Sequence, residues 1–230
     1  MQHQNRPPSG GRLPAAYFAI MTTSRPPADI LTQTRTTAVA ATMQQIRAII
    51  GAALEPTPQQ LEQVAACLRQ LAALGGLFPD AHFPGPDEGV AETLYLLSED
   101  DDLNNALYLY RPAPGMSTPP HDHSTWAVIA GIEGEEPNTV WQSGTAPESG
   151  LQISRRFSVG PGQSACFTHD QIHSIAIAGE RAIKHLHLYG HSLLDLPRRR
   201  DFNAADGSSW PQTEKPLVLP PQSLTAASHA

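Results

Sequence analysis

Two histidines separated by one residue, His121 and His123, are the residues of this chain best suited to bind a metal ion. Alternate residues of a β-strand point to the same face, so the two imidazoles would lie side by side while Asp122 points away. Neutral imidazole nitrogens are suitable ligands for Fe, Zn, Ni or Cu. The alternative is that the pair only caps a turn near the surface, and the pair alone does not decide between the two.

The spacing of the residues around this pair adds to the metal hypothesis. Five residues separate Gly115 from His121, three separate His123 from Ala127, and six more lead to Gly134. This spacing is similar to the first motif of the cupins, in which both histidines are metal ligands. It departs from that motif at Ala127, where most cupins have a glutamate ligand.

A later stretch resembles the second cupin motif. Five residues separate Gly162 from Thr168, and two separate Asp170 from His173. Thr168 and Asp170 stand where the motif has Pro and Gly, whereas His173 falls on the third metal ligand. The resemblance implies a mainly β fold, the cupin barrel (a double-stranded β-helix of jelly-roll type), with a small N-terminal α-helical section.

The missing glutamate points to one group within the cupins. Three histidines leave a divalent metal with its full double-positive charge and with open coordination positions. The pattern resembles the thiol dioxygenases, the family of cysteine dioxygenase and 3-mercaptopropionate dioxygenase, over residues 36–202. It implies an Fe(II) cofactor and oxidation of a small thiol, 3-mercaptopropionate-like or cysteine-like, to its sulfinate with both atoms of O2. A Zn- or Ni-dependent cupin enzyme and a cupin that binds a small molecule without turnover remain alternatives.

A late β-prone segment carries His185, His187 and Tyr189 at alternate positions, which places them on one face of a strand. The thiol dioxygenases have Ser-x-His-x-Tyr there, so His185 stands where Ser is usual. The resemblance implies that Tyr189 hydrogen-bonds substrate or oxygen and that His187 orients its hydroxyl. The alternative is a polar strand face whose rings are satisfied locally.

The residue that would anchor a substrate carboxylate is less clear. The family's early-strand Arg or Gln falls near Thr93 or Leu94, and neither can pair with an anion. Arg198, nine residues after Tyr189, matches the other anchor of the 3-mercaptopropionate type, and a guanidinium is a natural partner for a carboxylate. The alternative is that Arg198 belongs to a solvated basic turn.

The elements that must position these residues follow from periodicity. Residues 36–54 and 58–74 predict two amphipathic helices, the second with Thr57, Pro58 and Gln60 in a capping box. Short β-prone runs separated by turn residues follow, and they predict a sandwich or barrel. The runs are residues 94–97, 106–111, 125–132, 139–143, 151–159, 164–168, 173–178 and 182–190.

We therefore expect four parts along the chain. They are a disordered N-terminal extension (1–34), a helical section packing on the barrel (35–90), the cupin barrel (91–205) and a C-terminal tail (206–230).

Composition limits the class of partner. With 22 acidic residues against 15 Lys and Arg, the net charge of −7 argues against nucleic acid or an anionic membrane. The two cysteines, Cys67 and Cys166, form no CxxC motif and fit a reducing cytoplasm. We expect a small thiol and O2 as partners, and a monomer or homodimer.

Overall fold

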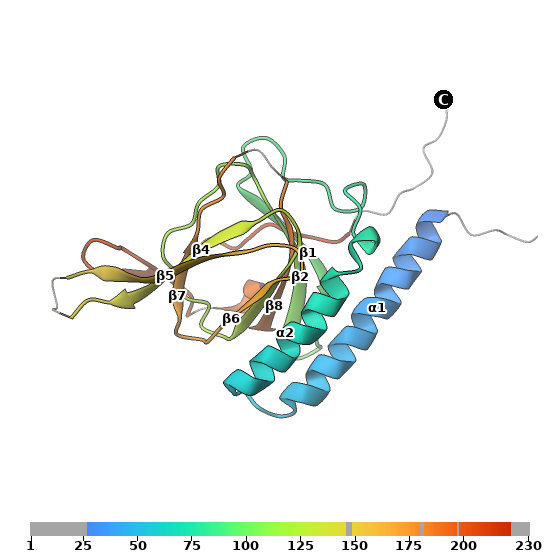
Figure 1. The fold of residues 1–230 in the computed structure, drawn as a ribbon, viewed down its shortest axis with the longest axis horizontal. Coiled ribbons are helices and arrows are strands. Elements are labelled where there is room, and N and C mark those ends of the chain that lie inside the picture. The colour runs from blue at the N-terminus through green and yellow to red at the C-terminus, as the bar shows by residue number, and fades with distance from the viewer. Residues whose placement is uncertain (1–26, 146–148, 180–181, 197, 222–230) are drawn as a thin grey trace, which may run out of the picture.

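The computed structural model describes residues 27–145, 149–179, 182–196 and 198–221. Two helices, α1 (Pro27–Ile50) and α2 (Pro58–Ala72), lie side by side against one face of a β-barrel (Figure 1). Among these described residues, no helix is long and apolar enough to cross a membrane.

Helix α1 begins earlier than the sequence predicts. Residues 27–34 are helical, whereas their sequence predicts part of a disordered extension; residues 1–26 of that extension lie outside the described residues. Arg35 gives a reason, because its guanidinium is buried, donates to the carbonyl of Leu77 at 3.0 Å and lies over the ring of Phe83. Contacts of Arg35 with the connection after α2 thus help to stabilise the N-terminal turns of α1, which their own sequence does not favour.

Helix α2 confirms its predicted start. Thr57 is the N-cap, Pro58 opens the helix, and the side chains and backbones of Thr57 and Gln60 form the reciprocal bonds of a capping box. Its buried face, which includes Leu61, Val64 and Leu68, packs on β3 (Ala127–Glu133) and β6 (Ser164–Phe167).

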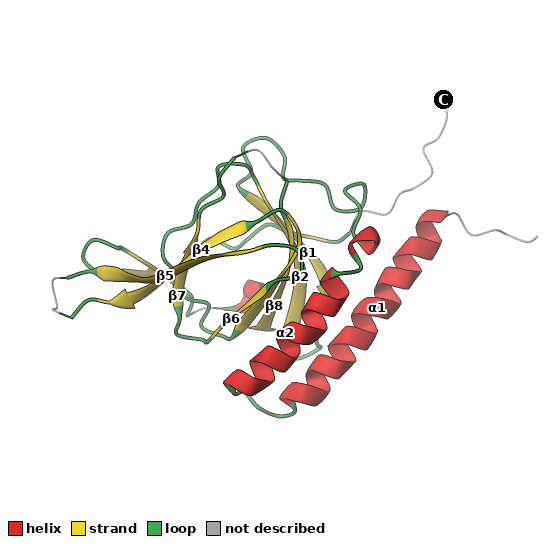
Figure 2. Cartoon of the chain, viewed as in Figure 1, coloured by secondary structure: helices red, strands yellow, loops and turns green. Residues whose placement is uncertain are grey.

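All eight predicted β-segments are strands, arranged in two sheets (Figure 2). The larger sheet has the order β11-β1-β2-β8-β3-β6. Its remaining strands are β1 (Glu92–Ser98), β2 (Asn104–Pro112), β8 (Lys184–His191) and β11 (Val218–Leu219). The smaller sheet has the order β5-β4-β7, formed by β5 (Leu151–Val159), β4 (Glu136–Ser143) and β7 (Ile172–Ile175).

The middle of the larger sheet is buried on both faces. Strand β8 lies in its middle, between β2 and β3, and is buried from Lys184 to Tyr189. Leu186 and Leu188 belong to the core that the helices cover, whereas the alternate residue Tyr189 belongs to the core inside the barrel. The pleat of one strand therefore separates an apolar outer core from the inside of the barrel.

The C-terminal region is more ordered than a simple tail. A hairpin of β9 (Arg200–Phe202) and β10 (Ser209–Pro211) follows the short 3₁₀ turn Leu193–Asp195, and β11 then pairs in parallel with β1. The predicted boundary at residue 206 thus falls inside this hairpin. Residues 222–230 lie outside the described part of the chain.

Candidate metal centre

The three predicted metal ligands meet inside the barrel. His121, His123 and His173 are each at most 3% exposed, and one ring nitrogen of each lies within 4.8 Å of the others. Nε2 of His173 lies 3.0 Å from Nε2 of His123. Two nitrogens bound at about 2.1 Å to one metal lie roughly 3 Å apart when the angle at the metal is about 90°, so the spacing of this pair suits two ligands of one ion.

The backbone fixes two of these ligands relative to each other. His121 donates its backbone N–H to the carbonyl of His173 at 2.8 Å, and His173 returns the bond at 2.9 Å. His121 comes from the segment before β3, and His173 comes from β7 in the opposite sheet. The two sheets are therefore joined at the site itself, which holds these imidazoles together.

In His121 and His173, a hydrogen bond made by Nδ1 determines that Nε2 is the nitrogen with a free lone pair. Nδ1 of His121 faces the carbonyl of Pro119 at 3.0 Å, and a carbonyl only accepts, so the hydrogen is on Nδ1 and Nε2 keeps its lone pair. Nδ1 of His173 donates to Oδ1 of Asn138 at 2.9 Å, with the same result. His123 differs, because its buried Nδ1 has no partner among the described residues.

All three rings are held in the form that binds metal. Burial lowers the pKa of His173 to about 3, with a further lowering by Arg199. Burial, together with the neighbouring ring of His173 and with Arg199, holds the pKa values of His121 and His123 well below the usual range. The imidazoles are therefore neutral at physiological pH, as ligation requires.

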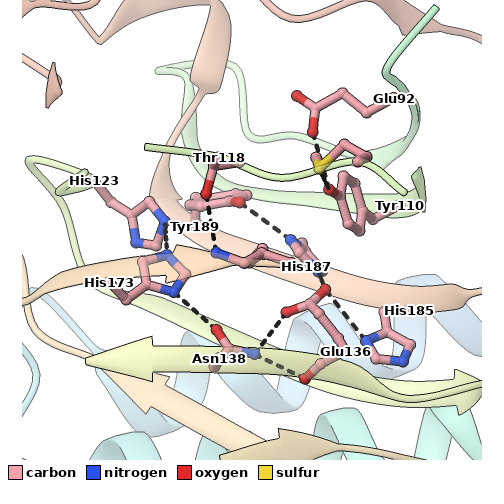
Figure 3. A network of polar contacts seen from close by, with 12 residues as sticks. Glu92, Tyr110, Thr118, His123, Glu136, Asn138, His173, His185, His187 and Tyr189 are labelled. Atoms are coloured by element: carbon pink, nitrogen blue, oxygen red, sulfur yellow. Dashed lines mark hydrogen bonds and ion pairs between the residues drawn. The ribbon is translucent and has the colours of Figure 1, made fainter. Parts of the chain in front are cut away.

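A chain of hydrogen bonds leads from this centre to the predicted tyrosine (Figure 3). The amide Nδ2 of Asn138 donates to Oε1 of Glu136 at 3.0 Å, and Nε2 of His187 lies 3.1 Å from Oε2 of the same carboxylate. Nδ1 of His187 then lies 3.2 Å from the hydroxyl of Tyr189. His187 thus contacts the Tyr189 hydroxyl, and its role in orienting that group stays a prediction.

Glu136 and Asn138 were not predicted as site residues. Both lie on β4 and are buried, at 0% and 2% exposure. Burial raises the pKa of Glu136, but the imidazoles of His187 and His185 lower it further, so the net result is a pKa well below the usual range. Two alternate polar residues at the start of a strand were the available signal, because alternate positions share a face.

His185 is inside the barrel, as strand parity predicts, and it approaches the carboxylate of Glu136. Its Nδ1 lies 3.5 Å from Oε2 of Glu136, and its side chain has no exposed surface. Within the described residues, neither of its ring nitrogens has a hydrogen-bond partner.

A small cavity of about 70 Å³ opens onto His121, His123 and His173. Its lining includes Tyr189, Leu94, Glu92, Arg199 and Asp201. Counting only described residues, the buried Nε of Arg199 and the buried Oδ1 of Asp201 each have no hydrogen-bond partner. Polar atoms buried without a partner are costly unless a ligand or water meets them, so this end of the cavity is suited to a polar group.

The structure does not bring Arg198 to this cavity. Arg198 is exposed and lines a separate surface groove, whereas its neighbour Arg199 faces the histidines. The reason lies in β9, which is bound to the His121 segment: Asp122 donates its N–H to the carbonyl of Arg200, and Phe202 donates to that of Pro120.

Alternation along this extended segment places Arg199 and Asp201 in the cavity lining, while Arg198 and Arg200 are exposed. The position of the inward arginine thus depends on how the loop after β8 returns to the site.

A scan against models of protein families and a search of curated proteins each gave no match. Solved structures do match, at low identity. An oxalate oxidase is 17% identical with a TM-score of 0.38, over 50% of this chain and 59% of its own. A protein with a double-stranded β-helix domain from Klebsiella pneumoniae subsp. pneumoniae MGH 78578 is 12% identical with a TM-score of 0.37, over 60% and 96%.

A cupin 2 conserved barrel domain protein from Leptotrichia buccalis is 21% identical with a TM-score of 0.36, over 48% of this chain and 45% of its own. The two sheets, with the strand orders given above, form a barrel of the predicted cupin type. The predicted fold class is confirmed, with the two helices of the N-terminal section packed on the larger sheet.

Proposed function

We propose that this cupin is a non-haem Fe(II) thiol dioxygenase that oxidises a small thiol to its sulfinate. The observation that carries the proposal is the ligand set: three buried histidines converge, and no carboxylate joins them among the described residues. Ala127 places only a methyl group where most cupins have glutamate, and it is packed in the core inside the barrel.

The histidines provide neutral donors, so the charge of a bound metal would not be reduced by its protein ligands. An Fe(II) ion held there would supply a Lewis acid that favours the thiolate form of a substrate and a redox centre for O2. Arg199 adds positive charge beside the site, which favours an anionic substrate. The overall reaction is balanced by one thiol and one O2 giving one sulfinic acid.

Tyr189 is the chain's own group best placed to act on the reacting atoms. It lines the cavity beside His123, with 5.2 Å between the ring centroids, and burial raises the pKa of its phenol well above the usual value. The hydroxyl therefore stays protonated at physiological pH and serves as a hydrogen-bonding group. His187 fixes its direction.

The cavity supports a small substrate with a carboxylate. A cavity of about 70 Å³ favours a small substrate over a large one. The guanidinium of Arg199 would bind a carboxylate at the far end of a short thiol, which is the role that the sequence analysis gives to Arg198. A 3-mercaptopropionate-like or cysteine-like thiol fits both conditions.

The test is anaerobic loading of the purified protein with Fe(II), followed by oxygen uptake with a panel of short thiols and analysis of the sulfinate. We expect one O2 consumed per sulfinate formed, with thiol carboxylates faster than uncharged thiols. No thiol-dependent uptake by iron-loaded protein would contradict the proposal. Activity with zinc or nickel in place of iron would favour a different cupin enzyme, and thiol binding without uptake would favour a binding protein.

A further inference from the structure

A second group of potential metal ligands lies inside the barrel. Glu136, His185 and His187 each offer one donor atom, and these atoms lie within 4.8 Å of one another. Both imidazoles approach the same carboxylate oxygen, Oε2, at 3.1 Å for His187 and 3.5 Å for His185. None of the three belongs to the histidine trio of the first centre.

The donor atoms are aligned by partners on their far sides, as is usual for metal ligands. Asn138 donates to Oε1 of Glu136 at 3.0 Å, which leaves Oε2 directed at the imidazoles. Tyr189 occupies the other ring nitrogen of His187, so Nε2 is the nitrogen that faces the carboxylate (Figure 3). Glu136 and His187 thus each have one atom held from outside and one atom directed into the cluster.

His185 supplies an independent indication that a ligand belongs in this cluster. Its side chain is fully buried, and neither nitrogen has a hydrogen-bond partner in the described part of the chain. Buried polar atoms are satisfied in the great majority of cases, so an unpaired one needs an explanation. At 3.5 Å its Nδ1 is too far from Oε2 for a good hydrogen bond, but it is close enough to share a metal ion with that oxygen.

Charge favours a cation in the same place. The carboxylate of Glu136 is completely buried, and the imidazoles of His187 and His185 that approach it carry a positive charge only when protonated. Lys184, the nearest lysine along β8, is engaged elsewhere, with Asp80 at 2.9 Å and Glu133 at 3.1 Å. A divalent ion between the carboxylate and the two imidazoles would balance the charge and give His185 Nδ1 a partner.

We propose that Glu136, His185 and His187 form a second metal site, which takes a divalent transition-metal ion such as Zn(II) or Fe(II). Two imidazoles and one carboxylate suit these ions rather than Mg²⁺ or Ca²⁺, which prefer oxygen ligands. The site shares Asn138 with the first centre, because the amide bonds to both His173 and Glu136. It goes beyond the proposed dioxygenase activity and does not depend on it.

Such an ion would also act on Tyr189. With Nε2 of His187 bound to metal, the ring hydrogen lies on Nδ1 and is donated to the phenol oxygen. The hydroxyl hydrogen of Tyr189 is then free to face the cavity. The second ion would therefore set the direction of the hydrogen bond next to the first centre.

Zinc stoichiometry tests the proposal. The full-length, untagged protein is stripped with a chelator, loaded with Zn(II), passed through gel filtration and analysed by plasma mass spectrometry. We expect two zinc ions per chain for the wild type and one for the double variant His121→Ala/His123→Ala, which lacks the first centre. One ion in the wild type and none in the double variant would overturn the second site.

A matched pair of variants assigns the second ion. Glu136→Gln keeps the shape of the side chain and is expected to bind one ion, whereas Glu135→Gln, at an exposed neighbouring position, should bind two. Two ions in Glu136→Gln would place the extra ion elsewhere and overturn the proposal.

If Glu136→Gln fails to fold, X-ray absorption at the zinc edge of the double variant decides the matter. Scattering from two imidazoles is expected there, and its absence would overturn the assignment.

Discussion

Asn138 accepts the Nδ1 hydrogen of His173 at 2.9 Å, and this bond decides which nitrogen of the ligand ring faces the metal centre. The amide cannot be turned over, because its Nδ2 donates to the backbone and side-chain oxygens of Glu136, which only accept. The candidate metal ligand His173 is thus oriented by a residue that belongs to neither cupin motif.

Replacing Asn138 by alanine should weaken metal binding at the first centre by about 10–100-fold, because the ring of His173 loses the partner that fixes it. Competition with a chelator of known affinity measures the change. Thr139→Ala is the matched control, since Thr139 is next on β4 and is not buried inside the barrel. Equal affinities in the two variants would contradict the role of the amide.

Replacing Tyr189 by phenylalanine should lower the turnover number for thiol oxidation by roughly 100-fold and leave the iron content unchanged. The ring and its edge contact with Tyr108, at 6.0 Å between centroids, are retained, and only the hydroxyl is lost. Steady-state oxygen uptake on iron-loaded protein gives the comparison. Tyr108→Phe removes a hydroxyl that bonds Ser192 instead, so it should cost about 1 kcal/mol of stability with little change in turnover.

Arg199 and Arg198 form a natural pair for testing the carboxylate anchor. Arg199→Ala should raise the KM for a thiol carboxylate by roughly 10–100-fold, because a charge-assisted hydrogen bond is lost. Arg198→Ala should leave it nearly unchanged, since that side chain is exposed and lines the other groove. A rise in KM for Arg198→Ala and not for Arg199→Ala would instead support Arg198 as the carboxylate anchor, as the sequence predicts. The KM for an uncharged thiol should stay the same in both variants.

Asp80 should make stability depend on pH. Its carboxylate accepts from Lys184 at 2.9 Å and from Arg111 at 2.5 Å, and these hydrogen bonds lower the pKa of Asp80 below its usual value. Because the folded-state pKa is the lower one, the stabilisation is fully present above the unfolded value of about 3.9 and is lost as pH falls through the folded value.

Asp80→Asn should therefore be less stable than the wild type at neutral pH, with a difference that shrinks below about pH 4. Urea unfolding across the acid range measures it. Asp87→Asn, at an exposed loop position, provides the control and should follow the wild type. A difference for Asp80→Asn that stays constant down to the acid limit would show that the carboxylate charge is not responsible.

The parts of the molecule that follow from local spacing could be predicted from the sequence. The capping box at Thr57, the β-segments and the convergence of His121, His123 and His173 all appear in the structure where the sequence places them. Each depends on residues close together in the chain or on a motif with fixed spacing.

The parts that depend on tertiary contacts could not be predicted in this way. The first turns of α1 are stabilised by Arg35 against a segment that follows α2. Arg199 rather than Arg198 faces the site because β9 returns to the His121 segment in a particular register. Glu136 reaches His187 across the barrel, and no short motif joins residues on opposite sheets.

The alternation of β8 also limits how this protein can evolve. Along β8, leucines that pack beneath the helices alternate with polar residues that point into the barrel. Inserting or deleting one residue would therefore turn the leucines into the barrel and the polar residues toward the helices. New substrate preferences can arise more easily in the loop after β8 that carries Arg199. A shift of this loop by one residue would turn a different side chain into the cavity and leave β8 intact.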